Sequence, residues 1–314
     1  SLCQVYKYPR FSSLLFSSLK ENIINLYCGS DSTPGEDDII EAYNVFENKE
    51  EVEIDIILSN EKYPQAAAEL AIKREDCVAF LGAPKEVSVG LKATEAARKT
   101  TEWRTRLNYN NRHVAYFSNY KYQYSPDLDK PCWINLVGDI GGIYAKSTFD
   151  NGSAWAAAGL NRGVIRNVDK LAVSFAEHHR DTLYKNQVNP IVTFPNQGSV
   201  IWGQKTSQTK NSSFNRINVV RIFKEMERAL SKMSKYSLFE FNDAFTRNYL
   251  TSIIRPYLAG KKADRSIIDS LVVCDETNNT PQVIANNQLV CDIFIKPNYS
   301  AEWIILHFVN VGTN

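Results

Sequence analysis

Apolar residues follow two different periodicities along the chain, one typical of strands and one typical of helices. Short apolar or alternating runs predict strands at 52–58, 78–81, 114–117, 190–194, 199–203, 238–241, 271–275 and 289–295. Helical patterns occur at 39–46, 63–74, 93–107, 217–233 and 243–258. Because strands alternate with helices in the first half, we expect an α/β layered fold around a largely parallel sheet, followed by a mixed α+β part.

Turn and capping signals mark several element ends. Asp243 is placed to cap the helix that follows it, and Gly260 is placed to end that helix. The tetrapeptide PNQG at 195–198 predicts a turn between two strands. A last apolar run extends from Ile304 to Val311.

The composition excludes some classes of protein but does not identify one. The 314 residues include 44% hydrophobic and 23% charged residues, a profile typical of globular proteins. The 36 Lys and Arg residues nearly cancel the 35 Asp and Glu residues, so a net charge of +1 gives no general reason to expect nucleic acid or an anionic membrane as partner. No apolar run reaches the ~18 residues that a membrane span needs.

The cysteine spacing bears on the compartment in which the protein folds, and the first residues bear on whether the sequence is a piece of a longer protein. Six cysteines are spread widely and form no CxxC pair, which favours reduced thiols and a cytosolic folding environment over a disulfide framework or a zinc site. The sequence starts at Ser1 without Met and without a signal pattern, so we expect a piece of a longer protein.

An ordered series of motifs in the second half is specific as a set, although each motif alone is weak. The motifs lie at 155–163, 189–191, 194–198, 200–206, 217–221, 239–243, 274–279, 295–297 and 301–304. Together they resemble the tail sheath family of contractile-tailed bacteriophages, the myoviruses. The first half, from Asp38 through the strand at Ile54 to the segment 137–144, resembles the central sheath domain more loosely.

The resemblance implies a division into three parts. Residues 1–35 are similar to the exit from the outer, variable domain of such subunits, 36–188 to a central α/β domain that has been likened to subtilisin, and 189–314 to the C-terminal sheath domain. The family often has prolines flanking an alanine where this chain has Trp155-Ala156-Ala157-Ala158, so the turn there differs.

The resemblance also implies a structural function. Such a subunit polymerises as helical rings around a tail tube and contracts to drive the tube through the host envelope. Its partners would be other copies of itself, the tail tube protein, and the baseplate and tail terminator proteins. It would reside in the virion tail, after assembly in the host cytoplasm, and would need no cofactor.

Four charged residues are the candidates for assembly contacts. Arg221, Lys224, Glu225 and Arg228 are expected on the exposed face of the 217–233 helix. The strand 289–295 is a second candidate, as an edge strand. An ordinary solvated helix face explains any one of these charges about as well.

An α/β hydrolase is the alternative from another class of protein. A Ser-His-Asp triad needs a serine on an exposed elbow, but no Gly-x-Ser-x-Gly occurs. Of the four histidines, His113 and His307 lie beside or within predicted strands and are expected to be structural. We therefore expect no catalytic residues. The sheath of a bacterial contractile injection machine is a further alternative, within the structural class.

Metal and phosphate sites are also not expected. His178 and His179 lie beside Glu177 and Asp181, but adjacent helical residues point about 100° apart and rarely share an ion. A solvated face or a subunit contact explains them better. The segment 138–142, GDIGG, lacks the Lys-Ser/Thr of a P-loop, so close backbone packing is the better account of its glycines.

A tyrosine-rich segment leaves two interpretations open. Its members are Tyr109, Tyr116, Tyr120, Tyr122 and Tyr124. They would stack on single-stranded nucleic acid, or they would cover a subunit interface from a half-buried strand. The near-neutral charge favours the interface, because nucleic-acid affinity normally needs a basic groove.

The resemblance gives a first testable expectation. Sheath subunits link by donating terminal strands to a neighbour's sheet, which uses main-chain hydrogen bonds. The sequence as given lacks the family's N-terminal segment and stops at Asn314, before the extended arm. We expect these 314 residues to be monomeric and unable to polymerise. Sedimentation velocity measures this directly, and a tubular high-mass species would contradict it.

Overall fold

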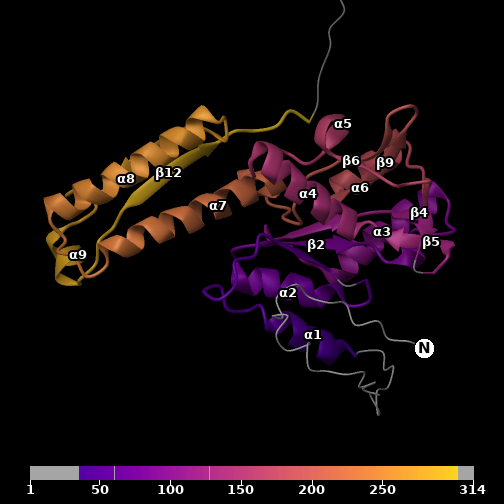
Figure 1. The fold of residues 1–314 in the computed structure, drawn as a ribbon, viewed down its shortest axis with the longest axis horizontal. Helices are drawn as coiled ribbons and strands as arrows, with labels where there is room; N and C mark the ends of the chain where they lie inside the picture. The colour runs from indigo at the N-terminus through magenta and orange to yellow at the C-terminus, as the bar shows by residue number, and fades with distance from the viewer. Residues whose placement is uncertain (1–34, 60, 127, 303–314) are drawn as a thin grey trace, which may run out of the picture. The chain divides into compact units, whose positions relative to one another are not determined.

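The computed structural model describes residues 35–59, 61–126 and 128–302 (Figure 1). The apolar run 304–311 lies outside the described residues. The proposed exit from an outer domain, 1–35, also lies outside them except for Gly35. All statements below concern the described part of the chain.

A parallel sheet forms the centre of this part. Its strands are β1 (Ile56–Leu58), β2 (Val78–Gly82), β3 (Val114–Phe117) and β8 (Val188–Asn189), paired in the order β1-β2-β3-β8. Every pairing in it is parallel, as the alternation of strands and helices predicts. All residues of β2 and β3 are buried, which explains their continuous apolar sequences.

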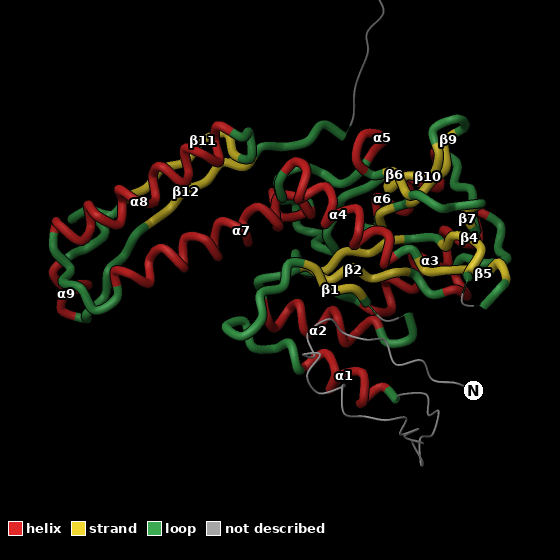
Figure 2. Tube along the Cα trace, in the orientation of Figure 1, coloured by secondary structure: helices red, strands yellow, loops and turns green. Residues whose placement is uncertain are grey.

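Helices cover both faces of the central sheet (Figures 1 and 2). One core contains residues of α2 (Pro64–Arg74), α3 (Ala93–Leu107) and α6 (Glu177–Lys185). The other contains residues of α4 (Val137–Asn151) and the first turns of α7 (Ile217–Ser234).

Successive strand residues alternate between these two cores. Leu81 belongs to the first core, whereas Phe80 belongs to the second, where its ring centroid lies 4.7 Å from that of Tyr144. The α/β class is therefore confirmed. The likeness of this part to subtilisin stays a prediction.

Two small antiparallel sheets flank the centre. One pairs β4 (Tyr120–Ser125) with β5 (Lys130–Asn135) and β7 (Lys170–Leu171). The other pairs β10 (Gly198–Ile201) with β9 (Ile191–Phe194) and β6 (Val164–Ile165), which confirms the predicted turn at 195–198. The remaining short elements of the first two thirds are α1 (Glu36–Asn44), η1 (Lys85–Val87), α5 (Gly159–Arg162) and η2 (Ser213–Asn215).

The hairpin of β9 and β10 packs into the central cores, through Val192 and Val200 on one side and Ile191 and Ile201 on the other. The predicted boundary between 188 and 189 falls inside β8. The division into central and C-terminal domains at that point stays a prediction.

A separate hydrophobic core lies beyond the first turns of α7. It combines the rest of α7 with α8 (Ala244–Ala263), β11 (Ile267–Val273) and β12 (Asp292–Pro297). The short helices η3 (Lys235–Ser237) and α9 (Pro281–Ala285) complete this part. Its central side chains are Ile222, Met226, Leu250, Ile254 and Leu258.

Asp243 caps α8 as predicted. Its Oδ1 accepts a hydrogen bond from the backbone N–H of Thr246 at 2.9 Å. The predicted end of this helix near Gly260 is wrong, because α8 continues to Ala263. A glycine destabilises a helix by only about 1 kcal/mol, so the packing of α8 on β11 is enough to keep the residues after Gly260 helical.

The predicted strand 52–58 is shorter than expected, since only 56–58 pair with β2. The carbonyl groups of Val52 and Ile54 are used elsewhere. They accept hydrogen bonds from the side chains of Arg74 at 2.8 Å and Arg228 at 3.0 Å. Hydrogen bonds from distant arginine side chains thus take the place of main-chain hydrogen bonds to a neighbouring strand.

The predicted strand at 238–241 is wrong. This segment is the irregular connection between η3 and α8, and Phe239 has a positive φ of 69°. The apolar residues that suggested a strand are exposed, with Phe239 and Phe241 among the most exposed side chains described.

The expected close backbone approach at the glycines of 138–142 is also wrong in part. These residues belong to α4, where a Cβ on Gly138 or Gly142 would meet nothing within 4 Å. Only Gly141 has a close neighbour, since its Cβ would lie 2.8 Å from Cδ2 of Leu58, a side chain and not backbone.

The two environments predict different stabilities for alanine substitutions at two adjacent glycines. Gly142→Ala should raise the free energy of unfolding by about 0.5–1 kcal/mol, because alanine favours the helix and meets no neighbour. Gly141→Ala gains the same propensity but has to displace Leu58, so it should be clearly less stable than Gly142→Ala. Chemical denaturation of both variants measures this, and equal stabilities would show that Leu58 does not constrain the position.

Candidate functional site

The four predicted assembly residues lie on α7, where two of them are buried and two are partly exposed. Arg221 is only 6% exposed and Lys224 only 8%. The expectation of exposure is wrong for these two residues, because this part of α7 packs against α4 and the edge of the central sheet. Their assembly role stays a prediction, and within the chain they have other contacts.

Arg221 lies against α4. Its Nη2 donates to Oγ1 of Thr148 at 2.6 Å, and its guanidinium lies over the ring of Tyr144 at 5.4 Å from the centroid. Burial lowers the pKa of the Arg221 guanidinium below its ordinary value. Lys224, one turn further on, pairs with Glu227 at 2.5 Å.

Arg228 ties α7 to the sheet edge. Nη1 donates to Oδ1 of Asp55 at 2.8 Å, and Nη2 donates to the carbonyl oxygens of Ile54 at 3.0 Å and Asp76 at 3.3 Å. Glu225 accepts hydrogen bonds from the Ser153 hydroxyl and from Nζ of Lys261, the latter at 2.5 Å. These contacts connect the α7 charges to the central part and to α8.

A buried arginine forms a further ion pair next to these contacts. The fully buried Arg74 at the end of α2 donates from Nε and Nη2 to both carboxylate oxygens of Asp76, at 2.9 and 2.8 Å. Next to it, burial raises the pKa of the Cys77 thiol to about 12, so this cysteine stays a protonated thiol.

One cavity brings the four predicted residues together. Arg221, Lys224, Glu225 and Arg228 all line a cavity of about 240 Å³, whose remaining lining residues are Asp55, Asp76, Cys77, Val78, Thr148, Gly152 and Ser153. We call this set of residues the polar junction. Sequence reasoning found its α7 members through their charge and missed Asp55 and Asp76, which are more than 140 residues away along the chain.

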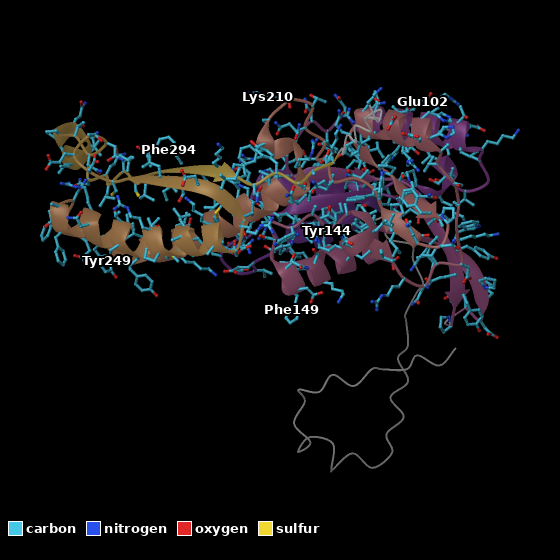
Figure 3. All side chains as sticks on the ribbon, turned by 90° about the horizontal axis from the view of Figure 1, so that it is seen from above. Glu102, Tyr144, Phe149, Lys210, Tyr249 and Phe294 are labelled. Atoms are coloured by element: carbon cyan, nitrogen blue, oxygen red, sulfur yellow. The ribbon has the colours of Figure 1, made fainter. Side chains whose placement is uncertain are left out.

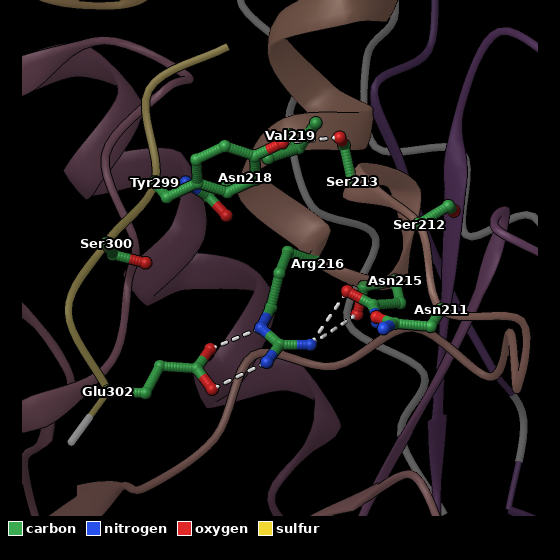
Figure 4. A pocket seen from close by; sticks show the side chains of 10 residues that line it. All are labelled: Asn211, Ser212, Ser213, Asn215, Arg216, Asn218, Val219, Tyr299, Ser300 and Glu302. Carbon is green, nitrogen blue, oxygen red and sulfur yellow. Dashed lines mark hydrogen bonds and ion pairs between the residues drawn. The ribbon is translucent and has the colours of Figure 1, made fainter.

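A second polar pocket, of about 460 Å³, lies where the chain returns from β12 (Figure 4). Arg216 at the start of α7 forms an ion pair with Glu302 through two hydrogen bonds, at 2.5 and 2.8 Å. Tyr184 donates to the same carboxylate at 2.8 Å. Residues 298–302 are thereby fastened to the central part.

Exposed apolar side chains gather at the far end of α7 and the start of α8. We call them the apolar tip, whose members are Tyr236, Leu238, Phe239, Phe241, Phe245 and Tyr249. Figure 3 marks Tyr249 on α8. Patches of this kind normally mark interaction sites, because scattered single apolar residues are common on a surface but clusters are not.

The sheet of β11 and β12 also exposes apolar side chains. Leu271 and Phe294 are directly opposite each other across the two strands, and both are exposed. Figure 3 labels Phe294 on β12. In the described residues these strands pair only with each other, so each has an edge whose main-chain groups have no strand partner. The expected edge strand 289–295 corresponds to β12, which starts at Asp292.

The tyrosine-rich segment does not form one surface. Tyr116 and Tyr120 are fully buried in the core, so neither stacking on nucleic acid nor an interface explains them. Tyr122 packs on Trp133 with ring centroids 4.9 Å apart, and Tyr124 is exposed. Tyr116 is buried because β3 is an inner strand of the central sheet, and Tyr120 is buried at the start of β4.

The histidines that the structure describes do not form a triad. Nδ1 of His113 contacts the carbonyl oxygen of Cys77 at 2.9 Å, and its Nε2 accepts from Arg112 at 3.2 Å, so both ring nitrogens are used. Nε2 of His179 contacts Oγ1 of Thr94 at 3.0 Å. Among the described residues no three His, Cys, Asp or Glu side chains are grouped to hold a metal ion, and no helix is long and apolar enough to cross a membrane.

The fold is that of contractile sheath proteins. The helical sheath of the anti-feeding prophage in its contracted state superimposes with a TM-score of 0.71 at 21% identity, over 88% of this chain and 76% of the other. A sheath complex of the extracellular contractile injection system PVC, also contracted, gives 0.71 at 17% identity, over 85% and 74%.

Sequence comparison gives the family. The phage tail sheath central-domain model matches residues 38–207, and the phage tail sheath C-terminal-domain model matches 209–309, so the chain belongs to the phage tail sheath family. It is 35% identical to the tail sheath protein of Vibrio phage KVP40, over 91% of this chain. It is also 35% identical to that of Enterobacteria phage T4, over 88%. The chain spans only 46% and 45% of the length of these two relatives.

The polar junction yields a prediction about stability. Arg228→Glu should lower the free energy of unfolding by more than about 2 kcal/mol, because it places a carboxylate beside Asp55 and removes three hydrogen bonds from a charged donor. Lys232→Glu is the matched control: it reverses a charge on the same helix, but its ion pair with Glu53 is exposed, so the substitution should cost far less stability than Arg228→Glu. Thermal and chemical unfolding compare the two, and equal losses would contradict a structural role for Arg228.

Proposed function

We propose that this chain is the structural body of a contractile phage tail sheath subunit. Many copies would polymerise as helical rings around a tail tube, and the rings would contract to drive the tube through the host envelope. Membership of the tail sheath family carries this proposal, supported by the exposed apolar surface at the end of α7 and on β11 and β12.

The open edges of the β11–β12 sheet suit the way in which such subunits would be linked. A strand from a neighbouring copy would pair with an edge through main-chain hydrogen bonds, and the exposed Leu271–Phe294 pair would be covered in the lattice. Links of this kind hold while the connecting arm bends, so subunits would rearrange as rigid bodies during contraction. The energy would come from the difference in contacts between two packings.

The further partners are part of the proposal. We infer that the sheath contacts a tail tube protein and ends on baseplate and tail terminator proteins, and that it is assembled in the host cytoplasm before it becomes part of the virion tail. The subunit itself would act without cofactor, nucleic acid or membrane binding, and would not be an enzyme.

Of the two alternatives, the injection-machine sheath has the stronger support, since injection-system sheaths share the fold. The relatives at 35–38% identity are all phage tail sheath proteins, which favours the phage. The hydrolase has no supporting geometry among the described histidines.

The apolar tip provides the test. In the full-length protein, the double substitution Phe239→Ser and Phe241→Ser should abolish polymerisation of the sheath, because it removes exposed aromatic surface that belongs to none of the three cores. Phe149→Ser, which removes an equally exposed phenylalanine from α4, is the control and should polymerise normally (Figure 3).

Electron microscopy and sedimentation measure the polymers. Circular dichroism and thermal unfolding check that each variant is folded. Normal tubes from a folded double variant would show that subunits do not meet through the apolar tip. Tubes that form without a tail tube but not around one would assign the tip to the tube instead.

A further inference from the structure

The polar junction contains one buried cation without a counter-ion. Its three carboxylates are each paired with another base: Asp55 with Arg228, Asp76 with Arg74 and Glu225 with Lys261. Lys224 pairs with Glu227 outside the cavity. Arg221 has no carboxylate within ion-pair distance among the described residues, although it is the most buried base that lines this cavity.

Arg221 also has unused hydrogen-bond donors. Only Nη2 has a partner, the Oγ1 of Thr148, whereas the buried Nε and Nη1 have none among the described residues. Buried polar atoms are nearly always hydrogen-bonded, and leaving a charged group unsatisfied costs more than leaving a neutral one. The position of Thr148 in the cavity lining places the guanidinium at the cavity wall.

The cavity has room and further positive charge for a ligand. At about 240 Å³ it is far larger than the ~10–15 Å³ that a cavity needs to hold one water molecule. Lys224 also lines it, and its ammonium group has donors beyond the single bond to Glu227. Because each acid in the lining is already paired with a base, Arg221 is the base that remains to attract an entering anion.

We propose that the polar junction binds a small oxyanion, a phosphate or a carboxylate, on Arg221 and Lys224. The unused Nε and Nη1 of Arg221 and the ammonium of Lys224 would donate to its oxygens. Such an ion would neutralise Arg221 and join α4 to α7, at the point where the central part meets the helix that leads to the C-terminal core. The site does not depend on the proposed assembly and is testable without it.

The experiment titrates inorganic phosphate into the full-length, unassembled protein, by calorimetry and by thermal unfolding, with sodium chloride at equal ionic strength as reference. We expect saturable binding and a saturable rise in Tm. Phosphate also stabilises proteins by general exclusion from their surface, so saturation and the response of the variants decide the result.

Two variants make the test specific. Arg221→Met should lose both the binding heat and the saturable part of the Tm rise. Arg247→Met is the matched control, since Arg247 is also 6% exposed but is hydrogen-bonded to Asn242 away from the cavity, and it should respond as the parent protein does. If Arg221→Met does not fold, Lys224→Gln should weaken phosphate binding severalfold instead. Absence of saturable binding to the parent protein, or binding by Arg221→Met or Lys224→Gln that is as tight as binding by the parent, overturns the proposal.

A last measurement separates the two sources of the oxyanion. If a carboxylate of a neighbouring copy fills the site in the polymer, phosphate should inhibit polymerisation of the full-length protein over the concentration range in which it binds. If free phosphate is the ligand, polymerisation should be unchanged or promoted over that range. Both results are consistent with an oxyanion site. The phosphate titration, which is done first, establishes whether that site exists.

Discussion

Helix α7 belongs to two hydrophobic cores at once, and this double membership is the constraint on which the structure depends. Ile217 and Val220 pack into the core between the central sheet and α4, and Ile222 and Met226 pack into the C-terminal core. One end of a continuous helix cannot rotate relative to the other end without breaking the backbone hydrogen bonds between them. The C-terminal core is therefore held to the central part by a rigid element.

The polar junction makes this connection resistant to rotation. Apolar contacts alone are non-directional, so a helix packed only through them can roll about its axis. The bonds from Arg228 to the backbone of Ile54 and Asp76, and from Lys261 to Glu225, have defined directions and fix that roll. The ion pair of Arg216 with Glu302 adds a second fastening, where the chain returns from β12.

A rigid connection of this kind suits a subunit whose contacts change while its fold does not. Clustered exposed apolar side chains lie beyond the junction, on the apolar tip and on β11 and β12. Groups that fasten the fold are thus separate from groups available to neighbours. The charges that looked like interface residues in the sequence belong to the first set, and the aromatic residues of the predicted strand 238–241 belong to the second.

Local patterns by themselves determined much of this protein. The apolar runs at 78–81 and 114–117 sufficed for β2 and β3, the helix 93–107 was predicted to the residue, and Asp243 was recognised as a cap, because each depends on neighbours within a few positions. The ordered motifs of the second half also sufficed for the family.

Only the tertiary structure decided what the charges on α7 do. An amphipathic pattern shows which residues share a helix face, but it cannot show that a polar face will be enclosed by α4 and the sheet edge. The same holds for Val52 and Ile54, whose carbonyl groups bind arginines 22 and 174 residues away instead of a neighbouring strand. Pairings over such distances depend on how the layers stack, and a single sequence carries no local signal of that stacking.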